Sequence, residues 1–327
     1  MYCVVFGFGS NYEDRLGVNE NRVMKPVKLD HNGEVAFVNA SGKKCTIDTA
    51  GQVSINGEKE PRIPTRAKFA TSSSGSHFVI DSASYLWSWG RNGHGQLASG
   101  DTNDRQAPGL VEVLRDEMIK QMSVCDDCVG CTTVNYECFV WGDCRWLGLD
   151  SAVTMPTKLD DTHQIGIKSI EIGNGHAMMI DAADDVYVIG YNYWDALGTD
   201  DNADNGSSWT KVKNLTGEVI KVQCGQSRSA ILTTTGVFVL GFGHGGSLPK
   251  QVALIAVADI SLSCQHILAL KKSGELFAWG WNRNGECGID SNKSYIDKPT
   301  RVHGIENYQI RQISAGAGYS LICCAPK

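Results

Sequence analysis

Residues 125–131, with the sequence CDDCVGC, contain two Cys-x-x-Cys spacings, and two more cysteines follow at Cys138 and Cys144. Cysteine pairs at this spacing are common ligands of structural zinc, so a zinc site is one interpretation. The other is that these cysteines replace structural turn residues, because Cys128 lies as far before Gly142 as His176 lies before Gly190. We favour the structural interpretation and expect no metal. The cysteines concerned are Cys125, Cys128 and Cys131.

Three histidines recur at similar distances before a glycine that ends an apolar segment. His176 and His266 precede their glycines, Gly190 and Gly280, by the same distance, and His77 lies one position closer to its own. Repetition at one level of a repeat favours a hydrogen-bonding turn residue over a catalytic or metal-binding one. No Ser-His-Asp or Cys-His grouping follows from the spacing, so we expect no catalytic residue.

Residues 241–246, GFGHGG, are rich enough in glycine to suggest a phosphate-binding loop. Such a loop needs the start of a helix directly after it. Here Ser247-Leu248-Pro249 and a strand-like segment follow. We therefore interpret the segment as a turn and expect no nucleotide or other cofactor.

Several aromatic residues lie just after strands or in the loops between them, where they either cap sheet edges or form anchors for a protein partner. These candidate partner-binding residues, with two charged neighbours, are Trp146, Tyr193, Trp194, Asp195, Trp209, Trp281 and Arg283. Acidic loop residues accompany them at Asp143, Asp150, Asp160, Asp161, Asp200, Asp201 and Asp204. If these loops share one face, it suits a basic partner. The strand tryptophans Trp87, Trp89, Trp141 and Trp279 are expected in the core.

The elements that position these residues are short strands that repeat along the chain. An apolar strand ending in glycine recurs seven times, with a hairpin before it, and helical periodicity is scarce. The seven anchor glycines are Gly7, Gly57, Gly90, Gly142, Gly190, Gly241 and Gly280. Residues 310–324 supply half of one of these seven units, and residues 1–7, with Gly7, supply the other half. We therefore predict an all-β, seven-bladed β-propeller, a single domain over 1–327, closed by pairing the N-terminal and C-terminal strands.

Composition narrows the functional classes. The 327 residues are 42% hydrophobic and 20% charged, with a net charge of −6, which disfavours direct nucleic-acid binding by bulk electrostatics. The first residues do not resemble a signal peptide, and no apolar run reaches membrane-spanning length. We therefore expect an intracellular, reducing compartment without membrane attachment, in which the 12 cysteines act as small buried hydrophobes.

The order of residues 73–97, a turn, His, strand, hinge, strand and then Trp-Gly-x-Asn-x-x-Gly-Gln-Leu, resembles the regulator of chromosome condensation repeat. Residues 264–288 form a second good copy, and the resemblance covers essentially the whole chain. The Gly-His and Trp-Asp signatures of WD repeats are absent. The Gly-Trp-Arg-His-Thr turns of the family's plant UV-B photoreceptor are also missing, so light sensing is not expected.

Within the family, Gly7-Phe8-Gly9 and Trp279–Trp281 are similar to the short, stand-alone domain-containing members. That resemblance implies a non-enzymatic, monomeric adaptor or regulatory subunit, in the nucleus rather than the cytoplasm. Its partner would be a chromatin-associated protein, such as a JmjC-type oxygenase or a histone. The alternative is a guanine-nucleotide exchange factor for a small Ran- or Rab-like GTPase, as the founding member is for Ran, although no residue maps onto an exchange wedge. A bacterial-type propeller that inhibits an enzyme is a further, less favoured possibility.

Overall fold

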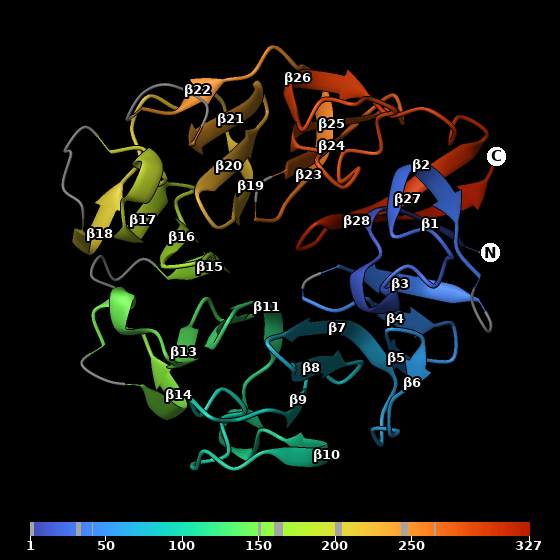
Figure 1. The fold of residues 1–327 in the computed structure, drawn as a ribbon. Coiled ribbons are helices and arrows are strands. Elements are labelled where there is room, and N and C mark those ends of the chain that lie inside the picture. Colours follow the sequence, from blue (N-terminus) through green and yellow to red (C-terminus); the bar gives the residue numbers. More distant parts are fainter. Residues whose placement is uncertain are drawn as a thin grey trace. The chain divides into compact units, whose positions relative to one another are not determined.

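The computed structural model describes residues 3–30, 34–40, 42–149, 152–159, 166–199, 205–242, 248–264 and 266–327. Seven four-stranded antiparallel sheets make up the fold, which is the predicted all-β, seven-bladed propeller (Figure 1). Regular helix in the described residues is limited to four single turns of 3-10 helix, η1 Tyr12–Asp14, η2 Glu112–Leu114, η3 Arg145–Leu147 and η4 Tyr193–Asp195. No described helix is long and apolar enough to cross a membrane.

The chain divides into two compact units. The terminal unit comprises residues 1–72 and 253–327, and the central unit comprises residues 73–252. Treatment of residues 1–327 as one domain therefore stays a prediction.

Three sheets belong to the terminal unit. The first contains β1 Val4–Ser10, β2 Arg22–Lys28, β27 Tyr308–Ala315 and β28 Tyr319–Pro326. The second contains β3 Val35–Asn39, β4 Cys45–Asp48, β5 Val53–Ile55 and β6 Glu58–Lys59. The third contains β23 Val257–Leu262, β24 His266–Lys271, β25 Leu276–Trp281 and β26 Tyr295–Arg301.

Four sheets belong wholly or mainly to the central unit. The first contains β7 Ala67–Ser73, β8 Ser76–Asp81, β9 Leu86–Gly90 and β10 Arg105–Leu110, and the second contains β11 Ile119–Cys125, β12 Cys128–Thr133, β13 Cys138–Gly142 and β14 Val153–Lys158. The third contains β15 Ile167–Ile172, β16 His176–Asp181, β17 Val186–Tyr191 and β18 Asn205–Lys211. The fourth contains β19 Val219–Cys224, β20 Arg228–Thr233, β21 Gly236–Gly241 and β22 Lys250–Gln251.

Six sheets run as simple meanders, and one joins the two ends of the chain. In that sheet the strand order is β2-β1-β28-β27 (Figure 1). β1 pairs with β28 without a register shift, from Val4 opposite Cys324 to Gly9 opposite Tyr319. The predicted pairing of the N-terminal and C-terminal strands is confirmed.

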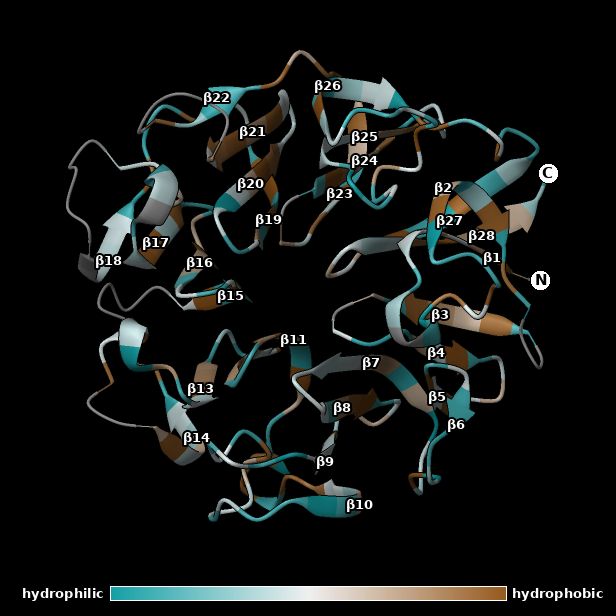
Figure 2. Ribbon diagram, viewed as in Figure 1, coloured by the Kyte–Doolittle hydropathy of each residue, from teal (hydrophilic) through white to brown (hydrophobic). Residues whose placement is uncertain are grey.

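Burial explains why the two middle strands of each sheet are apolar while the outermost one is polar. Every residue of β16, β20 and β21 is buried, whereas β22 is exposed. Figure 2 shows the same contrast between the hydrophobic β21 and the hydrophilic β10. Neighbouring sheets of the central unit share core clusters, such as Val140 of β13 with Ile170 of β15. Each fully buried aliphatic side chain of this kind contributes about 1.5–3 kcal/mol to stability.

The anchor glycines are required by the backbone at the end of the third strand. Gly90, Gly190 and Gly241 have φ between 96° and 112°. A Cβ there would overlap a carbonyl oxygen of the turn that precedes the second strand. Only glycine fits, because the position combines positive φ with close approach of another backbone.

Two predicted anchors need correction. In the first sheet the equivalent residue is Gly9, with φ 111°, because Gly7 lies two residues earlier in β1 and has no positive φ. Gly57 is the second residue of the two-residue turn that joins β5 to β6, where Asn56 also has positive φ. That is the preferred hairpin turn with left-handed residues at both central positions.

Candidate functional site

Four loops that follow third strands share one internal frame. Each begins with a buried asparagine two residues after the anchor glycine, at Asn11, Asn92, Asn192 and Asn282. The asparagine Oδ1 accepts a hydrogen bond from the backbone N–H five residues further on. The pairs are Asn11–Leu16 at 2.7 Å, Asn92–Leu97 at 2.9 Å, Asn192–Leu197 at 3.0 Å and Asn282–Cys287 at 3.1 Å. The side chain thereby replaces backbone partners that an irregular loop lacks.

The same loops place left-handed residues at fixed offsets from the asparagine. Three residues on, φ is positive at Asp14, Gly95, Asp195 and Gly285. Six residues on, it is positive at Gly17, Ala98, Gly198 and Gly288. These positions belong to the shared frame, and glycine is the residue that adopts them at least cost.

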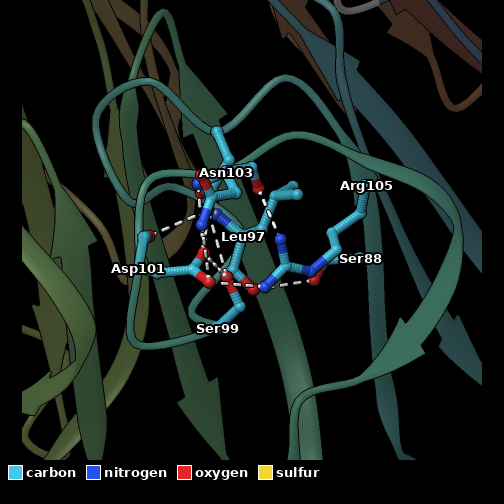
Figure 3. A network of polar contacts seen from close by, with 7 residues as sticks. Ser88, Leu97, Ser99, Asp101, Asn103 and Arg105 are labelled. Atoms are coloured by element: carbon cyan, nitrogen blue, oxygen red, sulfur yellow. Dashed lines mark hydrogen bonds and ion pairs between the residues drawn. The ribbon is translucent and has the colours of Figure 1, made fainter.

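Loop 92–98 is held by further polar contacts on its outer side (Figure 3). Asn92 Nδ2 donates to Ser99 Oγ at 3.0 Å and to the Asp101 carbonyl at 2.9 Å. Arg105 Nη2 lies 2.7 Å from Asp101 Oδ2, and this hydrogen bond holds the pKa of the Asp101 carboxyl well below its usual range. Ser88 Oγ donates to the Leu97 carbonyl at 2.8 Å. The polar residues of this loop are thus used to hold it in place.

Loop 192–198 departs from the frame at one residue, Trp194. Its φ is 63° and its ψ is 26°, although the corresponding His94 and Asn284 do not have positive φ. A bulky side chain in the left-handed region costs about 1–2 kcal/mol. The Trp194 side chain is nevertheless 63% exposed. Burial of the Trp194 side chain therefore does not compensate for its backbone strain.

Trp194 meets a second exposed aromatic ring from the next sheet. The rings of Trp194 and Phe242 are 5.1 Å apart and nearly perpendicular, and Phe242 is 42% exposed. On the protein side the guanidinium of buried Arg228 lies 5.6 Å from the Phe242 ring centroid. We call Trp194, Phe242 and Arg228 the Trp194 patch. Edge-to-face rings and a cation over a ring are both favourable contacts, so they fix the orientation of the Trp194 and Phe242 rings at the surface.

The remaining predicted residues lie in different surroundings. Trp146 in η3 and Trp209 in β18 are half-buried and pack against one core cluster formed by two sheets. That packing agrees with the interpretation of these two residues as caps of sheet edges. Trp281 ends β25 and is half-buried, while Arg283 is exposed and its carbonyl accepts a hydrogen bond from Arg22 Nη1 at 3.3 Å.

Part of the prediction lies outside the described residues or in the core. The side chain of Tyr193 is not described, nor are Asp150, Asp160, Asp161, Asp200, Asp201, Asp204 or residues 243–246 of the glycine-rich segment. Trp89, Trp141 and Trp279 are buried as predicted, but Trp87 is half-buried and donates from Nε1 to Asp81 Oδ2 at 2.9 Å. Phe242 was not predicted, because the glycine-rich segment that contains it was interpreted only as a turn.

The recurrent histidines link neighbouring sheets. His176 Nε2 lies 2.9 Å from Ser229 Oγ, which donates to the Ala196 carbonyl of loop 192–198 at 3.0 Å. His266 repeats this contact with Ser320, at 2.8 Å. Burial lowers the pKa of His176 to about 4, so the ring is neutral at pH 7. These two histidines have the structural role that was predicted.

His77 is an exception in register. Ser76 faces the anchor Gly90, and His77 faces Trp89 instead, with the two rings 5.5 Å apart. The spacing alone does not reveal this shift, because Arg228 has the same separation from Gly241 and faces it.

The cysteine segment requires a second correction. Cys128 and Cys144 form a disulfide with an S–S distance of 2.09 Å, although all cysteines were expected to act as reduced hydrophobes. Cys128 occupies the histidine position of its repeat and Cys144 the asparagine position, two residues after Gly142. Cysteine at both positions of one repeat was the available signal. Among the described residues, no three His, Cys, Asp or Glu side chains are placed to hold a metal ion.

Comparison with known proteins gives consistent results. The model of the regulator of chromosome condensation (RCC1) repeat matches residues 85–131 and 273–323, and a second model of this repeat matches residues 257–286. The E3 ubiquitin-protein ligase HERC2 of Mus musculus is 27% identical over 367 aligned positions, which cover 97% of this chain and 8% of that protein. The ultraviolet-B receptor UVR8 of Arabidopsis thaliana is 28% identical over 278 positions, 79% of this chain and 63% of the receptor. The chain thus spans less than two thirds of both relatives.

Two solved structures match the whole chain. Human WBSCR16 superposes with a TM-score of 0.87 at 17% identity and is covered completely. Yeast RCC1 (Prp20), in the structure with Kap60, superposes with a TM-score of 0.88 at 14% identity, over 89% of that chain. At such identities these matches show the fold alone.

Proposed function

Because the chain is an RCC1-repeat propeller protein, with a fold that serves protein interaction, we propose that it is a non-enzymatic adaptor or regulatory subunit that binds a protein partner through the Trp194 patch. The observation that carries this proposal is the left-handed, exposed Trp194, since its backbone strain and solvent exposure serve no folding purpose. Strained residues of this kind concentrate at binding sites.

The patch has the chemistry of an interface anchor. Tryptophan is enriched among interface residues whose truncation costs about 2 kcal/mol or more. Trp194 rests on Phe242, which restricts its movement before binding and so lowers the entropy lost on association.

Charge at the turn ends of neighbouring sheets favours a basic partner. Asp126 and Asp127 form the turn between β11 and β12, and Asp143 follows β13. Burial and the neighbouring Asp127 raise the pKa of the Asp126 carboxyl, as expected where carboxylates are crowded. The Asp126 carboxylate accepts a hydrogen bond from Asn174 at 2.6 Å, which links it to the sheet that carries Trp194. A basic segment would meet complementary charge at Asp126 and Asp127, whereas the Asp143 carboxylate is already paired with Arg145 at 2.7 Å.

For the identity of the partner we propose a chromatin-associated protein, a histone or a JmjC-type oxygenase, and hence a nuclear location. The solved yeast relative Prp20p is described by its binding to Gsp1p and histones, which supports a histone-like partner for this chain by analogy.

The same relative favours a second candidate function, guanine-nucleotide exchange on a small Ran- or Rab-like GTPase. The superposition covers this chain completely. An exchange factor acts on its GTPase as a catalyst, whereas an adaptor forms a stable complex with its partner. The two functions therefore predict different behaviour of the purified protein.

The direct test is affinity purification of the tagged chain, followed by mass spectrometry, with Trp194→Ala and Trp281→Ala in parallel. We expect the wild type and Trp281→Ala to recover the same partner. Trp194→Ala should recover at least about tenfold less of that partner. Equal Tm values for the variants would exclude unfolding as the cause. Retention of the partner by Trp194→Ala would show that the patch is not the contact.

The exchange alternative is tested by release of labelled GDP from purified Ran and several Rab proteins. The adaptor proposal expects no acceleration by micromolar protein. Acceleration by the wild type would replace the adaptor proposal with the exchange factor, whatever the effect of Trp194→Ala.

A further inference from the structure

Three free cysteines lie together where the two ends of the chain pair. Cys3 directly precedes β1, and Cys323 and Cys324 lie in β28. In the ladder between these strands Val5 lies opposite Cys323, and Val4 lies opposite Cys324. Side chains alternate along a strand, and this alternation, continued one residue before β1, puts Cys3 on the face of Cys323. The two are diagonal neighbours across the strand pair, within reach of each other's side chains.

The side chains of Cys3 and Cys323 are in direct contact. Their thiols are hydrogen-bonded to each other. Burial, together with this contact, raises the pKa of the Cys323 thiol well above its usual range, so Cys323 is protonated at pH 7. Cys323 is 1% exposed, whereas Cys3 is half-buried. Cys3 is therefore the member of the pair that a dissolved oxidant can reach.

We propose that Cys3 and Cys323 are an oxidation site, at which a peroxide converts the two thiols to a disulfide that joins β1 to β28. The Cys3 sulfur attacks one oxygen of hydrogen peroxide, the O–O bond breaks, and Cys3 becomes a sulfenic acid as one water leaves. The Cys323 sulfur then attacks the Cys3 sulfur. The S–S bond forms, the S–O bond breaks, and the hydroxyl group leaves with the Cys323 proton as a second water.

The surroundings favour Cys323 over Cys324 as the partner of Cys3. A disulfide needs Cα atoms within about 7 Å and Cβ atoms that point toward each other. Cys324 is the neighbour of Cys323 in β28, so its side chain points to the opposite face of the sheet. The ladder between β1 and β28 begins at Val4, so the backbone of Cys3 lies outside it and can adjust to the geometry of the bond.

A bond at this place would link two strands that almost the whole chain separates. Cross-links that close long loops restrict the unfolded chain most, so the disulfide should stabilise the sheet that joins the two ends. The cysteine pair lies in the terminal unit and the Trp194 patch in the central unit. Failure of either proposal therefore leaves the other standing.

The test treats the full reduced chain with hydrogen peroxide and maps disulfides by mass spectrometry of peptides prepared without reductant. We expect the peptide that contains Cys3 to be linked to the peptide that contains Cys323 and Cys324. Cys324→Ser is the matched control and should keep the link, whereas Cys323→Ser should abolish it. A link that persists in Cys323→Ser, or oxidation of Cys3 in the wild type without any link, would overturn the proposal.

Thermal denaturation tests what the bond does to the fold. The oxidised wild type should have a Tm at least about 4 °C above that of the reduced wild type, because the cross-link restricts the unfolded chain. Cys3→Ser should show no such rise, which controls for oxidation of other cysteines. A link without a rise in Tm would refute the stabilisation.

Alkylation replaces the substitution if Cys323→Ser does not fold. Iodoacetamide in limited amount should modify half-buried Cys3 of the reduced wild type before buried Cys323. Blocking Cys3 in this way should abolish both the link and the rise in Tm. Survival of either after alkylation of Cys3 would refute the site.

Discussion

Loops 92–98 and 192–198 are built on one frame and differ in how they use it. Both start from a buried asparagine that accepts the N–H of a leucine, Leu97 or Leu197, and both have left-handed residues at the same two offsets. In loop 92–98 the Asn92 amide also donates to the Asp101 carbonyl and so holds the loop to the segment that follows it, whereas in loop 192–198 the strained Trp194 projects into solvent. The comparison teaches that the repeat specifies the frame, and that function is to be sought at positions that the frame does not need.

The largest expected effect is on the free energy of unfolding, and it differs between Asn92 and Asn192. Asn92→Ala should lower the free energy of unfolding by about 4 kcal/mol, because Ser99, Asp101 and Leu97 all lose their hydrogen bond to a fully buried side chain. Within the described residues the Asn192 side chain makes one such bond, to Leu197, so Asn192→Ala should cost about 2 kcal/mol. Urea denaturation measures both. Equal losses would show that the outer contacts of loop 92–98 add nothing.

A smaller decrease in the free energy of unfolding should appear on acidification. The folded pKa of His176, about 4, lies below the unfolded value of 6.5, so the unfolded chain binds more protons between these pH values. The associated stability is fully present above pH 6.5 and is lost as pH falls through 4, a change of about 3 kcal/mol.

Because His176 supports loop 192–198 through Ser229, acid should loosen that loop first. The corresponding carbonyl of loop 92–98, that of Gln96, accepts from Trp141 Nε1 at 2.7 Å, and an indole does not titrate. Hydrogen exchange of the Leu197 and Leu97 amides at pH 7 and pH 4 compares them. His176→Gln should abolish the difference, and parallel exchange in the wild type would contradict the assignment.

The smallest effect is expected from substitution by glycine at the position that distinguishes the two loops, which is Trp194 in one and His94 in the other. Trp194→Gly should raise the free energy of unfolding by about 0.5 kcal/mol, because relief of left-handed strain exceeds the lost contact with Phe242. His94→Gly should lower it by about 0.5–1 kcal/mol, since His94 has no such strain to relieve. Thermal denaturation of the pair gives the sign. Destabilisation of both by the same amount would mean that Trp194 is not strained.

The fold could be predicted because the glycine anchors and hairpins recur, and because the end of the chain supplies strands that its start lacks. What the repeat determines, such as the roles of His176 and His266, followed from spacing alone. Where a copy departs from the pattern, spacing failed: Gly7 was chosen in place of Gly9, since both glycines flank one phenylalanine and only backbone φ distinguishes them.

The site was less predictable, for a physical reason. The sequence does not distinguish Trp146 and Trp194, which follow strands, from Trp209, which lies in β18. The structure nevertheless buries Trp146 and Trp209 partly in a shared core cluster and leaves Trp194 exposed. Which ring is left in solvent depends on packing between sheets, to which distant segments contribute. The exposure of Phe242 depends on such contacts too.

The pairing of β1 with β28 has a consequence for synthesis. Val4 and Cys324 are partners from opposite ends of the sequence, so β1 leaves the ribosome long before the strand that completes its sheet. Until then its edge is open to pairing with another chain. Contacts of such sequence separation form slowly. The nascent protein therefore depends on protection of that edge, and loss of the segment Tyr319–Pro326 would make the exposure permanent.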